Sequence, residues 1–151
     1  MILPITLTIT GASALINIWL GRRVGQMRLA HKISIGDGGN EALTARMRAQ
    51  SNFIEYTPLV LILIGLIELA VGSKLWLWVV GVVYILGRIA HAFGMDRRSP
   101  DPLRLRMIGI IVTMLVLFGL ALYAIVLPYL HPAPATITYA VGFSSGGTKL
   151  S

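Results

Sequence analysis

The sequence predicts an all-α integral membrane protein, built as a bundle of four transmembrane helices. Its composition is the first observation: the 151 residues are 56% hydrophobic and only 13% charged, and the mean hydropathy is +0.78. These values are far from those of an ordinary soluble domain. The second observation is that four stretches are apolar over about the 20 residues that a spanning helix needs. The third is that basic residues gather between alternate stretches, which is typical of membrane topology signals.

The four predicted spans follow one another along the chain, at residues 2–21, 53–73, 75–95 and 107–130. The first span differs from a signal peptide, because no Lys or Arg precedes its apolar run. It also continues into Arg22 and Arg23 without a small-residue cleavage site. We therefore expect the first span to be a retained helix.

The connections between the spans predict an antiparallel bundle. Gly72 and Ser73 predict a tight turn between the second and third spans. Prolines fix φ and restrict the residue before them, so the Ser-Pro-Asp-Pro sequence at residues 99–102 separates the third and fourth spans. The first connection contains the glycine-rich stretch 33–40, and Asn40 is placed to cap a following helix. We expect the prolines to lie in loops and at helix ends.

The distribution of basic residues predicts the orientation. Two connections carry most of the positive charge, namely Arg22, Arg23, Arg28, Lys32, Arg46 and Arg48 in the first, and Arg97, Arg98, Arg104 and Arg106 in the third. The other side has only Lys74 and, near the end of the chain, Lys149. By the positive-inside rule, loops 22–48 and 96–106 are cytoplasmic and both termini lie outside. We therefore expect the basic residues behind the net charge of +7 to set the orientation and to contact membrane lipid. We expect no nucleic-acid partner.

Polar residues at membrane depth mark a candidate site, because ionisable groups are costly there. Arg48, Asn52 and Glu55 stand at i, i+4 and i+7, so on a helix they share one face within roughly 60°. That face must contact other helices or a polar ligand. Arg88 and His91 lie three residues apart in the third span and share a face in the same way.

Several kinds of chemistry are excluded by missing residue types and motifs. The sequence has no cysteine, so a thiol could enter a reaction only as a cosubstrate. It has neither a P-loop nor a G-x-G-x-x-G fingerprint. Its histidines have no metal-ligand spacing, and we expect no metal site.

Four motifs together resemble the MAPEG family, the membrane-associated proteins of eicosanoid and glutathione metabolism, and in particular its bacterial branch. The segment Arg48-Ala-Gln-Ser-Asn52-Phe-Ile-Glu55 resembles the family's Arg-Ala-His-x-Asn-x-x-Glu signature. Gly25-Gln-Met-Arg28-Leu resembles a stretch that ends the first helix of some glutathione-dependent members. The loop at 36–39 and the Arg-x-x-His pattern at 88–91 complete the resemblance, which spans about residues 1–130.

The resemblance implies a homotrimer of four-helix bundles that binds glutathione as cosubstrate between neighbouring subunits, near the cytoplasmic side. Glutathione has two carboxylates, one amine and one thiol. In this reading Arg28 and Arg48 hold its carboxylates, Glu55 binds the γ-glutamyl amine, and Asn52 hydrogen-bonds its backbone. The implied activity is a glutathione-dependent transferase or peroxidase that acts on hydrophobic small electrophiles, and the implied location is the bacterial inner membrane.

The same resemblance assigns roles to four other residues. Arg88 and His91 would shape the pocket from the third helix. Arg104 lies sixteen residues after Arg88, where glutathione-activating members also carry an arginine, and would stabilise the thiolate. Asp37 resembles a loop aspartate with a catalytic role in some members.

The alternative function is a non-catalytic accessory membrane subunit of the same family. Two departures favour it: Gln50 replaces the histidine of the signature, and Met95 stands where a tyrosine is expected. In this alternative Arg48 and Glu55 form a structural ion pair that stabilises the assembly. We divide the chain into a membrane domain, residues 1–131, and an irregular polar tail, residues 132–151, which could dock on a larger membrane complex.

Overall fold

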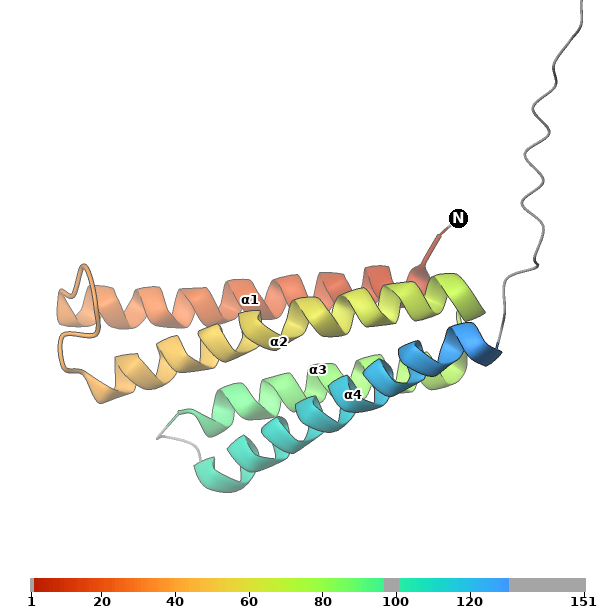
Figure 1. Cartoon of the computed structure of the whole chain (residues 1–151). Helices are drawn as coiled ribbons and strands as arrows, with labels where there is room; N and C mark the ends of the chain where they lie inside the picture. The colour runs from red at the N-terminus through yellow and green to blue at the C-terminus, as the bar shows by residue number, and fades with distance from the viewer. Residues whose placement is uncertain (1, 97–100, 131–151) are drawn as a thin grey trace, which may run out of the picture.

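The computed structural model describes residues 2–96 and 101–130, which form four helices arranged up and down (Figure 1). The helices are α1 (Pro4–His31), α2 (Glu41–Val71), α3 (Leu75–Gly94) and α4 (Pro102–Leu130). All four are long and apolar enough to cross a membrane. The predicted all-α fold with four spans is therefore confirmed. The predicted tail, residues 132–151, lies outside the described residues.

The helices on either side of the first connection are longer than their apolar runs. We predicted spans at 2–21 and 53–73, but α1 continues to His31 and α2 begins at Glu41. Asn40 caps α2 as expected, since its side-chain oxygen accepts a hydrogen bond from the Leu43 backbone N–H at 3.0 Å. Arginine is a good helix former, so the basic segments extend the helices beyond the apolar core. The connection itself is reduced to residues 32–40.

The prolines do not all lie at helix ends, and that expectation is wrong for two of them. Pro58 lies inside α2 and Pro128 inside α4. Transmembrane helices tolerate proline because neighbouring groups satisfy the freed carbonyl. The turns predicted in the stretch 33–40 and at Gly72 are confirmed. Their glycines Gly36, Gly38, Gly39 and Gly72 all have positive φ.

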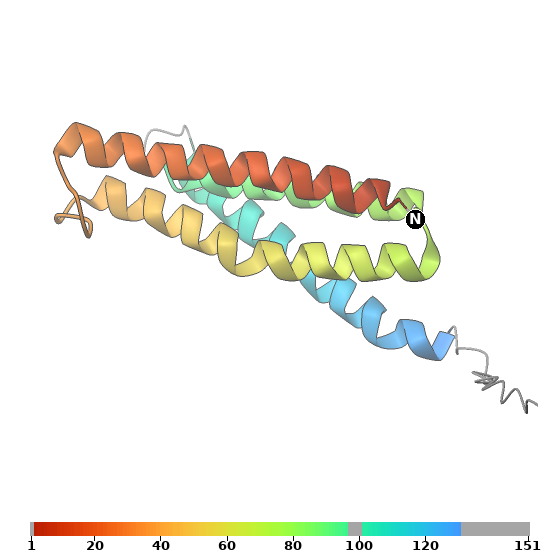
Figure 2. The ribbon, with the colours of Figure 1, turned by 90° about the horizontal axis from the view of Figure 1, so that it is seen from above.

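The bundle consists of two helix pairs, α1 with α2 and α3 with α4. Two hydrophobic clusters lie along it: one contains Ile9, Ile64 and Tyr84, and the other contains Leu20 and Phe53. Figure 2 shows α4 running at an angle to the other helices, so that it crosses α2 and extends beyond it toward its C-terminal end. The core is therefore shared by α1, α2 and α3 along their length, whereas α4 joins it over a shorter distance.

Glycines hold α3 and α4 close together at the end that contains the α3–α4 connection. A Cβ atom on Gly109 would lie 2.7 Å from the Gly87 carbonyl oxygen and 2.5 Å from the His91 Cβ. One on Gly94 would overlap the Arg106 backbone. Only residues without a side chain permit this approach. Gly87 and Gly94 of α3 and Gly109 of α4 thus form the closest contact between these two helices.

Polar contacts fasten the two ends of the bundle. At one end the Glu68 carboxylate of α2 accepts hydrogen bonds from the Ile5 and Thr6 backbone N–H groups of α1, at 3.0 and 2.8 Å. At the other end Arg23 of α1 forms an ion pair with Asp96, which follows α3, at 2.8 Å. Arg46 of α2 approaches the same carboxylate at 3.5 Å. These contacts were not foreseen from the sequence, where Arg23 was assigned to topology alone.

Candidate functional site

A polar cavity lies between α2, α3 and α4, near the end of the bundle that carries the basic residues. Its volume is about 350 Å³, within the range typical of small-molecule sites. The residues that line it are Arg48, Ser51, Asn52, Glu55, His91, Met95, Arg106 and Ile110. Two guanidinium groups, a carboxylate, an amide, an imidazole and a hydroxyl thus face one space. Arg48, Asn52 and Glu55, which the helical spacing placed on one face, line this one cavity.

One side of the cavity opens on the surface of the protomer. Arg48, Ser51 and Glu55 are exposed, whereas His91 is buried behind them. Arg48 and Glu55 do not form an ion pair with each other among the described residues. Their charges are therefore available to a ligand or to a neighbouring chain.

Arg88 lies behind the cavity and links three helices. Its side chain is 1% exposed, and its Nη1 donates to the Asn52 Oδ1 at 2.9 Å and to the Thr113 Oγ1 at 3.2 Å. The guanidinium also lies 5.4 Å from the centre of the Phe53 ring. Its Nε and Nη2 find no acceptor within the described part of the chain. Arg88 thus holds Asn52 in place and supplies a buried positive charge next to the cavity.

Arg28 and Asp37 do not line this cavity within one protomer. Arg28 of α1 donates to the Ser34 carbonyl oxygen at 3.3 Å and lies 3.6 Å from the Met47 sulfur. Asp37 accepts hydrogen bonds from the Gly39 backbone N–H at 3.0 Å and the Thr44 hydroxyl at 2.8 Å. These two donors, the Gly39 N–H above all, lower the pKa of the Asp37 carboxyl below its ordinary value. Asp37 therefore shapes the α1–α2 turn as an anion.

Arg104 also lies away from the cavity, and Arg106 lies on it instead. Arg104 is 84% exposed and pairs with Asp101 at 3.1 Å. Arg106 lines the cavity from the first turns of α4, and Met95, the residue after α3, lines it as well. Arg106 is the residue that the sequence reasoning missed. Both arginines stand in the same basic segment, and only the packing of α4 on α3 decides which of them faces inward.

The two departures from the family signature have different places. Met95 is part of the cavity wall, so the replacement of the expected tyrosine changes the site itself. The Gln50 side-chain amide lies close to Gly21 of α1 instead, where a Cβ atom would be 3.2 Å from its nitrogen. Gln50 therefore belongs to the α1–α2 contact.

Four helices able to span a membrane, with a polar cavity between three of them, define an integral membrane protein with a candidate site near one end of its bundle. The chain belongs to the MAPEG family, whose model matches residues 6–126. It is similar to the inner membrane protein YecN of Escherichia coli, which is 30% identical over 87 residues in each of two strains. The alignment covers 57% of this chain and 66% of YecN, just under two thirds of that protein's length.

Proposed function

We propose that this protein binds glutathione in the polar cavity and uses it as a membrane-bound transferase or peroxidase on hydrophobic electrophiles. One observation carries the proposal: a cavity of about 350 Å³ combines Arg48, Asn52, Glu55 and Arg106. Cations suit the two carboxylates of glutathione, and a carboxylate suits its amine. A structural ion pair alone would need fewer groups.

Different residues of the cavity bind different parts of glutathione. Arg48 binds a carboxylate, Glu55 binds the γ-glutamyl ammonium, and Asn52, held by Arg88, hydrogen-bonds the peptide backbone. We assign the thiolate-stabilising role to Arg106 in preference to Arg104. A thiol with a pKa of about 8.5 needs a nearby cation to ionise near neutral pH.

The proposed chemistry follows from the thiolate. In transfer, the sulfur forms a bond to an electrophilic carbon, and the leaving group departs with the bonding electron pair. In peroxide reduction, two glutathione molecules are oxidised to the disulfide while the peroxide becomes an alcohol and water. The electrophile reaches the open side of the cavity from the bilayer.

The proposed assembly is a homotrimer in the bacterial inner membrane, the location given in the name of the relative YecN. The exposed side of the cavity supports a site completed by a neighbouring subunit. Arg28, which lies outside the cavity in its own protomer, is then the candidate that a neighbour contributes.

A non-catalytic accessory subunit is the second candidate function. Met95 favours it, because a thioether in the cavity wall is only a weak acceptor and cannot donate a proton or a hydrogen bond as a tyrosine would. In this alternative the network of Arg88, Asn52 and Thr113 stabilises the bundle, and the tail, residues 132–151, docks on a larger membrane complex.

Calorimetric titration with glutathione, combined with thiolate absorbance near 240 nm, separates these functions. We expect the detergent-solubilised protein to bind glutathione saturably with a thiolate signal. Glu55→Gln should abolish binding, because it removes the counter-charge of the amine, and should leave the oligomer intact. Glu41→Gln, on the same helix but outside the cavity, is the matched control.

The other outcomes are equally informative. Binding without the thiolate signal would support a site that has lost its activation. If the unchanged protein does not bind glutathione, the proposed enzyme function is contradicted. Loss of the oligomer in Glu55→Gln would favour the structural role of the polar cluster.

A further inference from the structure

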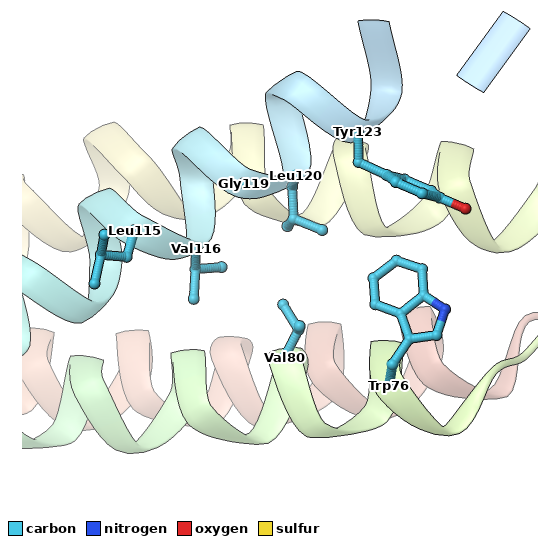
Figure 3. Close-up of a pocket in the computed structure, with 7 residues that line it drawn as sticks. All are labelled: Trp76, Val80, Leu115, Val116, Gly119, Leu120 and Tyr123. Carbon is cyan, nitrogen blue, oxygen red and sulfur yellow. The ribbon is translucent and has the colours of Figure 1, made fainter. Parts of the chain in front are cut away.

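A second, apolar cleft lies between α3 and α4 at the opposite end of the bundle, far from the α1–α2 loop. Its volume is about 440 Å³. Figure 3 shows Trp76 and Val80 extending from α3 toward Val116, Leu120 and Tyr123 of α4. Apart from the indole N–H and the phenol, its lining consists of hydrocarbon.

The cleft exists because the backbones of α3 and α4 are in close contact at one end of the bundle and separate toward the other. Gly87 and Gly109 bring the two backbones together near the polar cavity, and from there α4 diverges (Figure 2). Gly119 faces the cleft, and a Cβ atom there would meet no atom within 4 Å. Protein interiors rarely leave such spaces empty. Within a membrane, lipid acyl chains surround the helices and can fill this space.

Aromatic rings close the outer end of the cleft. The rings of Trp76 and Tyr123 pack edge to face with centroids 5.1 Å apart. Both rings also line a neighbouring cavity of about 390 Å³, whose other walls are Ala70, Val71 and Lys74. The rings thus divide an apolar compartment from one with a cationic wall, as aromatic residues do at membrane interfaces.

The Lys74 ammonium forms no ion pair with a carboxylate of the described residues, so it can bind an anion of another molecule. Glu68, the acidic residue closest to it in sequence, already accepts hydrogen bonds from Ile5, Thr6 and Ser73. Among residues 2–96 and 101–130, no carboxylate forms an ion pair with Lys74.

We propose that this place binds one phospholipid with an anionic headgroup, whose phosphate lies at Lys74 and one of whose acyl chains fills the cleft between α3 and α4. The order of a cation, an aromatic boundary and a hydrocarbon slot matches the order of polarity along a phospholipid molecule. Among the described residues, the acidic one at this end of the bundle is Glu68, which is buried, so a second copy would bring apolar side chains to the cleft and no described carboxylate to Lys74. The site is independent of glutathione and of the polar cavity.

Tryptophan quenching by brominated lipid tests the proposal. The protein is reconstituted in vesicles of dibrominated phosphatidylcholine, which is then replaced stepwise by unbrominated phosphatidylglycerol. Comparison with Trp76→Phe isolates the signal of Trp76. We expect phosphatidylglycerol to relieve this quenching about fivefold more effectively than unbrominated phosphatidylcholine, the factor that one lysine near a lipid surface supplies.

Two variants probe the two halves of the site. Lys74→Gln should remove the preference for phosphatidylglycerol, whereas Lys32→Gln, at the opposite end of the bundle, should preserve it. Gly119→Leu should reduce quenching of Trp76 because the new side chain fills the cleft, and Gly11→Leu, at another open helical glycine, should not.

Three results would overturn the proposal. The first is equal relief by both lipids in the unchanged protein, and the second is a preference that survives Lys74→Gln. The third is a change of oligomeric state in Gly119→Leu, since the cleft would then be a contact between copies. The lysine variants decide the matter even if Gly119→Leu fails to fold.

Discussion

Four arginines near the candidate site carry the same guanidinium group but have different surroundings. Arg88 is buried and hydrogen-bonded to two other helices, and Arg48 and Arg106 line the cavity. Arg104, two residues before Arg106, is exposed and paired with Asp101, the residue that precedes α4. An exposed pair of this kind contributes little to stability, whereas a cation beside a cavity can act on a bound thiol. The role of each arginine is therefore set by its place and not by its residue type.

At the residue scale, the two α4 arginines should differ in their effect on turnover. Arg106→Ala should lower kcat for glutathione conjugation by roughly 100-fold, a typical loss when one charge-stabilising group is removed. Arg104→Ala removes the same charge from the same helix and should leave kcat nearly unchanged. Steady-state kinetics with glutathione and a hydrophobic electrophile in mixed micelles measures both. A larger loss for Arg104→Ala would return the thiolate role to that residue.

At the scale of the element, the stability of a helix depends on whether the backbone groups at its ends have hydrogen-bond partners. The first backbone N–H groups of a helix have no partner inside it, and water is scarce within a bilayer. The N-cap position of α1 is Leu3, which makes no side-chain cap. The Glu68 carboxylate of α2 is the acceptor for these N–H groups. It also accepts hydrogen bonds from the Thr6 and Ser73 hydroxyls, at 2.6 and 2.7 Å. One buried carboxylate thereby joins the start of α1 to the end of α2.

Removal of this carboxylate should destabilise the bundle. Glu68→Ala leaves the Ile5 and Thr6 N–H groups without acceptors, and we expect a loss of about 2–3 kcal/mol in the free energy of unfolding. Thr6→Val removes only one hydrogen bond and should cost about 1 kcal/mol. Unfolding followed by tryptophan fluorescence in detergent measures both. Hydrogen exchange at the amides of Ile5 and Thr6 should rise in Glu68→Ala, and unchanged exchange there would contradict the capping role.

The glycine contact between α3 and α4 allows a second prediction for elements. Gly109→Ala places a Cβ atom 2.5 Å from that of His91, so the helices must separate, at a cost of about 1–3 kcal/mol. Gly11→Ala in α1 is the matched control, because a Cβ atom there meets nothing within 4 Å. Alanine is also the better helix former, so the control should gain up to about 1 kcal/mol. Similar Tm values for the two variants would show that the contact is not tight.

At the scale of the whole molecule, the two ends of the bundle differ in chemistry. The end with the α1–α2 loop contains the polar cavity, the Arg23–Asp96 ion pair and the basic segments. The opposite end contains Glu68, the aromatic pair and Lys74. Figure 1 shows the start of α1 and the end of α4 together at that second end. The four spans of the described residues place the start of α1 and the end of α4 on one side of the membrane.

This asymmetry predicts the orientation. Because basic residues are retained on the cytoplasmic side, alkaline phosphatase fused after the last residue of the chain should be active, and green fluorescent protein at the same place should be dark. A fluorescent protein inserted in loop 32–40 should be bright. The reverse pattern of all three reporters would invert the proposed topology and would place the polar cavity on the outer side.

Local sequence features determined much of this protein. A spanning helix needs only a run of apolar residues of sufficient length, so hydropathy was enough to predict four helices. Positive φ at Gly36, Gly38, Gly39 and Gly72, and the cap at Asn40, also depend on neighbours along the chain alone. The face shared by Arg48, Asn52 and Glu55 followed from helical periodicity.

Contacts between helices decided the rest, since they depend on the distance and rotation of one helix against another. The glycine contact sets how α4 lies on α3, and thereby brings Arg106 and not Arg104 to the cavity. Glu68 meets α1 across more than sixty residues of sequence, a pairing that no local pattern encodes. Helical periodicity fixes which residues share a face, but only the packed bundle determines what that face meets.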